Sequence, residues 1–191
     1  MVFSLYVSVL EVVWSEDKKL IVTRVYDSES LEKTEVRATH EDLAPLVELL
    51  ENVIPSILKI YHNSCSIENP VERISATLSA LMSKIFSKEV LMKMVAWVFA
   101  KRKLGGIKRV LMNVNSAYAR VIASVDLVSN AVAVECADDE LKNIASELCR
   151  KILKKEDIFA ILEVFSSMIL VCLIPREIRK NVWRKLKLLL L

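Results

Sequence analysis

The segment LKNIASELCRKILKKEDIFAIL, residues 141–162, decides the predicted fold, because it aligns without gaps on ISATLSALMSKIFSKEVLMKMV, residues 74–95. Six of the 22 aligned positions are identical, among them Lys88–Glu89 with Lys155–Glu156. The same shift, extended over residues 45–111, gives eleven identities in 67 positions. Tandem helical units usually stack around a shared core and present an extended surface. The pattern therefore predicts two degenerate three-helix units, about 43–109 and 110–176, and indicates an interaction or scaffolding role.

The segment that precedes these units is β-prone. Residues 2–14 and 20–26 are rich in β-branched and aromatic side chains and flank the charged turn SEDKK, which predicts a β-hairpin. KTEVRAT, residues 33–39, is a possible third strand. From residue 40 the apolar spacing changes to three and four. We therefore expect a predominantly α fold of the α+β class, with a small β-meander at 1–39 followed by a helical domain at 40–191.

Helix starts are well marked in the second unit. Asp138 and Asp139 are expected to start one helix, and a second is expected from Glu156 to about Leu173. A basic amphipathic helix is predicted at 175–190. Residues 119–136 alternate β-branched side chains around Ser129–Asn130 and suit either a helix or a hairpin. The repeat alignment favours the helix.

Composition limits the class of protein. The chain of 191 residues is 53% hydrophobic, with two glycines, at 105 and 106, and no glutamine. Long helices joined by short turns fit the scarce glycine, and the absence of glutamine is typical of thermophilic proteins. The four cysteines lack CxxC spacing, which indicates free thiols in a cytoplasmic, reducing compartment. The N-terminus lacks the basic region and cleavage site of a signal peptide.

The longest apolar stretch is IFAILEVFSSMILVCLI, residues 158–174, with Glu163 as its only charge. Its length reaches the lower limit for a membrane span. A carboxylate near the middle of a membrane is costly, and the aligned segment at 91–107 carries four cations. We therefore expect a helix buried in the core or in an oligomer interface.

Basic residues gather at the ends of the two predicted units. Residues 100–191 carry 17 basic and 10 acidic side chains, net +7, whereas residues 1–99 carry 10 and 14, net −4. Stacked units would merge the basic clusters into one ridge that attracts phosphates, although cations at helix ends also serve solubility and the helix dipole. The candidate residues for binding an anionic partner are Lys101, Arg102, Lys103, Lys108 and Arg109, with Arg176, Arg179, Lys180, Arg184, Lys185 and Lys187.

The sequence shows no catalytic or cofactor signature. His62 and Cys65 have half of a metal-site spacing, but no second half follows. The acidic clusters lie at predicted helix starts, where capping explains them. We therefore expect no catalytic residues, no metal, no cofactor and no small-molecule substrate.

These observations favour a non-enzymatic interaction or assembly module that self-associates through apolar helix faces, as a homo-oligomer or with a protein partner. Opposite-signed halves suit such self-association. The first alternative is a sequence-independent nucleic-acid-binding protein that uses the clusters at 101–109 and 176–187. The second is a peripheral membrane protein attached through the C-terminal helix.

Overall fold

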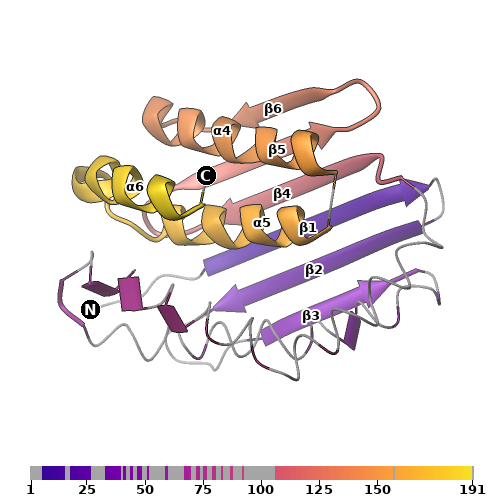
Figure 1. The fold of residues 1–191 in the computed structure, drawn as a ribbon, viewed down its shortest axis with the longest axis horizontal. Coiled ribbons are helices and arrows are strands. Elements are labelled where there is room, and N and C mark those ends of the chain that lie inside the picture. Colours follow the sequence, from indigo (N-terminus) through magenta and orange to yellow (C-terminus); the bar gives the residue numbers. More distant parts are fainter. Residues whose placement is uncertain are drawn as a thin grey trace.

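A six-stranded antiparallel β-sheet forms the centre of the computed structural model, with the order β3-β2-β1-β4-β5-β6 (Figure 1). The structure describes residues 6–15, 18–26, 33–39, 106–156 and 158–190, with isolated positions between 41 and 92. The strands are β1 (Tyr6–Ser15), β2 (Lys18–Tyr26), β3 (Lys33–Ala38), β4 (Arg109–Asn115), β5 (Arg120–Asp126) and β6 (Ala131–Glu135).

The three N-terminal strands lie where the sequence predicts them, but they belong to a larger sheet. β1 pairs with β2 on one side and along seven residues, Val7 to Val13, with β4 on the other. Strands from two segments that are far apart in the sequence therefore share one sheet.

The sheet has an internal pseudo-twofold symmetry. Leu10 of β1 pairs with Met112 of β4, and both side chains are buried. Two more antiparallel strands follow outward on each side of this pair, β2 and β3 on one side and β5 and β6 on the other. Alternate residues are buried in the same way, so that Leu20 corresponds to Val121 and Val22 to Ala123. The axis passes through the Leu10–Met112 pair.

Three helices follow β6: α4 (Asp139–Lys155), α5 (Ile158–Cys172) and α6 (Arg176–Leu190). The first two cover one face of the sheet, and α6 lies beside them (Figure 1). α4 packs over β5 and β6, and α5 over β4. Glu163, the charge within the apolar α5, accepts a hydrogen bond of 2.6 Å from Lys151 Nζ on α4. The apolar α5 is thus a core helix, as the sequence predicts.

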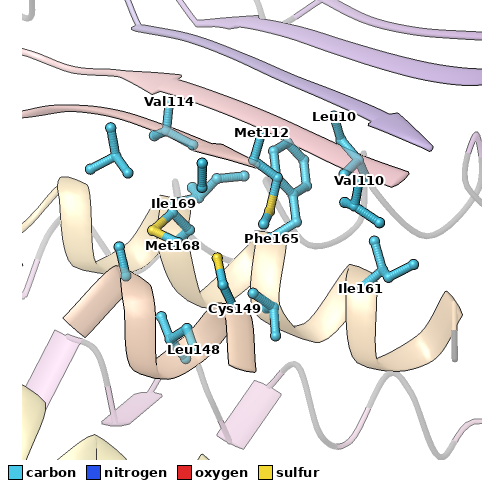
Figure 2. Close-up of a cluster of buried hydrophobic side chains, with 14 of the residues drawn as sticks. Leu10, Val110, Met112, Val114, Leu148, Cys149, Ile161, Phe165, Met168 and Ile169 are labelled. Atoms are coloured by element: carbon cyan, nitrogen blue, oxygen red, sulfur yellow. The ribbon is translucent and has the colours of Figure 1, made fainter. Parts of the chain in front are cut away.

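The core lies between the sheet and the α4–α5 pair. Leu10, Met112 and Val114 of the sheet face Cys149 of α4 and Phe165 of α5 (Figure 2). Alternation in the strands and three- to four-residue spacing in the helices supply the two sides of this layer. Each large apolar side chain buried here contributes about 1.5–3 kcal/mol.

The predicted helical bundle is wrong, because the unit at 110–176 begins with strands β4, β5 and β6 rather than with a helix. The helix predicted at 119–136 is the β5–β6 hairpin. Its turn is fixed by Asp126, whose Oδ1 accepts hydrogen bonds from the N–H groups of Val128 (2.9 Å) and Ser129 (3.0 Å), and by Asn130, which takes a left-handed φ of 55°. The alternation of β-branched residues therefore predicts this segment correctly, and the repeat alignment does not. Most of residues 74–95 lie outside the described residues.

Candidate contact surface

The first basic cluster lies at the start of β4. Lys108 precedes the strand, and its N–H donates to Val13 O (2.8 Å). Arg109 is the first residue of β4 and is exposed, on the sheet face opposite the helices. Lys101, Arg102 and Lys103 lie outside the described residues. The Arg109 side chain therefore points away from the helical layer.

Two arginines of the second cluster are tied to Asp138. Arg179 is fully buried, and its Nη1 lies 2.9 Å from Asp138 Oδ2 while its Nη2 donates to Ile174 O (3.1 Å). Arg176 Nε lies 3.5 Å from the same carboxylate oxygen. Asp138 also accepts the Leu141 N–H (3.1 Å) and so caps α4. That backbone hydrogen bond, followed by the two guanidinium groups, lowers the pKa of Asp138. Arg179 is therefore part of the fold.

The other members of this cluster lie on α6. Lys180, Arg184 and Lys185 are exposed, and Lys187 Nζ lies 2.6 Å from Glu147 Oε1 of α4. The apolar side of α6 is covered, since Val182 and Trp183 are buried in the core cluster. α6 thus presents mainly cations, with Leu188 exposed near its end, rather than an apolar stripe.

The structure does not merge the two basic clusters. Ser116, just after the last residue of β4, donates from Oγ to Cys172 O (2.6 Å), which places the α5–α6 junction at that end of the strand. Arg109 lies at the other end of β4, and its side chain is on the opposite face of the sheet. A single ridge across both clusters is not formed by the described residues.

The sheet face opposite the helices is open at its centre. Asn113 and Asn115 of the central strand β4 are exposed on this face. Apolar side chains from four neighbouring strands lie diagonally across it and are partly exposed. We call them the open-face band: Ile21, Val9, Leu111 and Ile122.

Charges of both signs surround the open-face band. Arg109 and Asp126 are cross-strand partners, and Arg109 helps to lower the pKa of Asp126 after the larger effect of the Ser129 N–H hydrogen bond. Arg37 and Glu35 form an ion pair on β3. An apolar centre with a polar rim is the usual anatomy of a protein–protein contact. The rim consists of Lys19, Lys33, Arg37, Arg109 and Arg120 with Glu35, Asp126 and Glu135, whereas Glu11 lies within the band, between Ile21 and Leu111.

The sequence does not predict this band, because Val9 and Ile21 are expected in a small meander and Ile122 in a helix. The usable signal is the period of two in β1, β2, β4 and β5, in which residues between the fully buried positions are also apolar. A sheet with one solvated face normally carries polar residues there. Apolar residues on the second face therefore make it a candidate contact surface.

The cysteines are structural where the structure describes them. Cys149 and Cys172 are buried free thiols, and burial raises the pKa of each to about 12. Cys136 is half-buried at the end of β6. Within the described residues, no group of three or more histidine, cysteine or acidic side chains is placed to hold a metal ion.

A shallow groove of about 480 Å³ lies where β3 ends. Three glutamates, Glu41, Glu48 and Glu51, line it together with Ala38, Thr39, Ala44 and Val47. The carboxylates repel anions, so this groove does not suit a phosphate backbone.

Among the residues that the structure describes, no helix combines the length and the apolar character needed to cross a membrane. Comparisons of the chain with protein-family models, with curated proteins and with solved structures find no match. The proposals below therefore draw on the sequence and the geometry of this chain.

Proposed function

We propose that the protein is a non-enzymatic assembly module that self-associates face to face through its open sheet. The open-face band is the observation that carries the proposal. Among the described helices, most apolar residues of α5 lie in the core, and Ile178, Val182 and Trp183 of α6 lie in or against it. The sheet therefore offers the larger apolar contact among the described elements.

A second copy suits the size of this surface. Six strands spaced about 4.8 Å apart and roughly 20–25 Å long span about 600–700 Å². Two such faces together bury roughly 1,200–1,400 Å², the lower end of the range for stable interfaces. Two sheets pack at about 10 Å with their strands within about 30° of each other, so the side chains of both bands interdigitate.

Charge supports self-recognition. The rim carries five cations and three anions on the described strands, and Glu11 adds an anion within the band, so two copies present nearly balanced charge to each other. A partner with one dominant sign would meet like charges on part of this rim.

The remaining perturbed groups support the non-enzymatic part of the proposal. Asp138 caps α4 and holds Arg179, and Asp126 fixes the β5–β6 turn. The thiols whose pKa values are raised are buried, which makes them poor nucleophiles. Free cysteines also fit a cytoplasmic location.

Molar mass in solution tests the proposal. We expect the wild-type chain to form a multiple of its monomer by light scattering at micromolar concentration. The double variant Leu111→Lys with Ile122→Lys places two ammonium groups in the band and should reduce that mass at least twofold. Asn181→Lys, on the exposed side of α6, adds one ammonium group away from the sheet and should leave the mass unchanged.

Circular dichroism and thermal unfolding show whether the double variant is folded. If it is not, Leu111→Thr with Ile122→Thr keeps the β propensity and removes apolar area, so it replaces the lysine pair. A strictly monomeric wild-type chain at high micromolar concentration contradicts the proposal.

A nucleic-acid-binding role is the second candidate, and the placement of α6 favours it. The Lys187–Glu147 ion pair fixes α6 beside α4, so that exposed cations of both helices, among them Lys180, Arg184 and Arg150, share the helical side of the molecule. Phosphate contacts of this kind weaken steeply with salt. Light scattering with a DNA duplex at low and high salt tests it, and an unchanged mass at low salt contradicts it.

A further inference from the structure

Strand β6 is the outermost strand of the described sheet (Figure 1). Its inner side pairs with β5 from Ile122–Glu135 to Asp126–Ala131 without a register shift. One row of its N–H and C=O groups therefore points away from the sheet, and within the described residues no strand pairs with that row. Such a row is a template for another strand.

β6 lacks three of the features that usually block an edge, although it is short and ends in the charged Glu135. Its sequence, AVAVE, contains no proline or lysine, and the strand has no bulge against β5. Ala131 and Ala133 are small and exposed, whereas Val132 and Val134 are only half-buried against the core. Val128, in the adjoining turn, is 77% exposed. An added strand would cover apolar side chains that this chain leaves partly open.

We propose that β6 pairs antiparallel with β6 of a second copy across a twofold axis at Ala133. This register overlaps all five residues of the strand, because Ala131 meets Glu135 of the other copy and Ala133 meets Ala133. The two sheets then join into one continuous sheet. The inference rests on the proposed self-association and adds a second contact to it.

Helix α4 makes the pairing electrostatically self-complementary. It packs over β5 and β6, and it carries Asp139 and Glu140 in its first turn and Lys154 and Lys155 in its last. Twofold pairing of β6 brings two α4 helices side by side in antiparallel directions. The acidic start of each then lies toward the basic end of the other, and the opposite helix dipoles add to the attraction.

The same kind of antiparallel strand pairing across a twofold axis is present within one chain. β1 and β4 pair antiparallel across the pseudo-twofold axis at Leu10–Met112 and link two three-stranded halves. The β6 edge repeats the same arrangement between chains. Its axis is perpendicular to the sheet, whereas the axis of the face-to-face contact lies parallel to it. When the in-plane axis runs across the strands and meets the axis at Ala133, the two contacts together give a closed assembly of four copies with D2 symmetry.

Charge-swap variants at Ala133 test the edge contact. Ala133→Lys and Ala133→Glu each place like charges opposite each other across the axis, so each should reduce the molar mass of the wild-type assembly twofold. An equimolar mixture of the two variants pairs lysine with glutamate and should restore the full mass. Ala133→Ser, a neutral change at the same exposed position, should keep it. An unchanged mass for Ala133→Lys overturns the proposal.

A cross-link fixes the geometry independently. With Cys136→Ser as background, Ala133→Cys should form a disulfide between the introduced thiols of two copies under oxidised glutathione, because paired antiparallel residues lie about 4.5–5.5 Å apart. Sheets stacked face to face are about 10 Å apart and do not allow it. Absence of this linkage by peptide mass spectrometry overturns the edge contact. Loss of mass in the Leu111→Lys, Ile122→Lys variant with no effect at Ala133 leaves the proposed function standing and removes only this inference.

Discussion

Asp138 shows how one side chain joins a helix start to a distant helix. Its Oδ1 accepts the Leu141 N–H at the start of α4, and its Oδ2 lies 2.9 Å from Nη1 of the buried Arg179 on α6. The N-cap is predictable from sequence, because the residue precedes an amphipathic run. The arginine is not predictable, because 41 residues separate the two and only the fold brings them together. Sequence reasoning therefore assigned Arg179 to an anion-binding surface, whereas the structure buries it.

Replacing Asp138 separates its two roles. Asp138→Ala should lower the free energy of unfolding by about 3–5 kcal/mol, because Arg179 stays buried without its counter-charge. Asp138→Asn removes the charge but keeps a side-chain acceptor for the cap, so it should cost less. The difference between the variants measures the capping contribution of about 0.5–2 kcal/mol, and the cost of Asp138→Asn measures the lost charge. Urea unfolding at pH 7 measures both.

The pH dependence of wild-type stability follows from the same carboxylate. The capping hydrogen bond and the arginines lower the pKa of Asp138 in the folded state. Its contribution is therefore complete above the unfolded pKa of about 3.9 and is lost as the pH falls through the lower folded value. Equal acid sensitivity of the wild type and Asp138→Asn would contradict this assignment.

At the scale of elements, helices α4, α5 and α6 were predictable and the β5–β6 hairpin was not. α4 has an acidic first turn, a basic last turn and apolar residues at helical spacing, so local signals and tertiary packing agree. In residues 119–136 the alternation of β-branched residues indicates strands, whereas the weak alignment to a helical segment indicates a helix. Asp126 and Asn130, whose residue types favour turns, are the local evidence for the hairpin, and both form its turn in the structure.

The end of α4 offers a test of backbone strain. Glu156 takes a left-handed conformation with φ 47°, and its N–H donates to Ile152 O (2.8 Å). A residue with a Cβ is disfavoured there by about 1–2 kcal/mol, and glycine is not. Glu156→Gly should therefore raise the free energy of unfolding by about 0.5–1 kcal/mol, after the entropy of glycine in the unfolded chain is subtracted.

Glu156→Ala is the control for this substitution, because it removes the same carboxylate and keeps the Cβ. Thermal unfolding of both variants compares them. A glycine variant no more stable than the alanine variant would show that the left-handed residue carries no strain.

For the whole molecule, the sequence predicts a contact surface on helix faces, whereas the surface that we propose lies on the sheet. The excess of apolar residues is real, and much of it is absorbed by a core in which sheet and helices share residues from Leu10 to Trp183. Leu111 and Ile122, among others, stay partly exposed on the second face of the sheet, and Tyr118, Val128 and Leu188 are exposed elsewhere. Local periodicity cannot show which strands pair across nearly a hundred residues, as β1 and β4 do. The open face therefore emerged only with the topology.

The buried thiols report on the integrity of this shared core. Cys149 of α4 and Cys172 of α5 lie in one cluster, and burial raises the pKa of each to about 12, so the thiolate is scarce in the native state at pH 8. We expect a disulfide reagent to label Cys136 quickly, and to label Cys149 and Cys172 only as urea unfolds the protein. Both buried thiols should react at the same midpoint, because one core unfolds cooperatively.

Peptide mass spectrometry assigns each label and separates the signal of Cys65, which lies outside the described residues. Cys136→Ser should remove its fast label and leave the midpoint of the buried thiols unchanged. Their raised pKa values also mean that the folded state binds these protons more tightly than the unfolded state, so stability should fall as the pH rises above about 8.5. Labelling of Cys172 at a lower urea concentration than Cys149 would show that α5 leaves the sheet before α4, and that the core does not unfold as one unit.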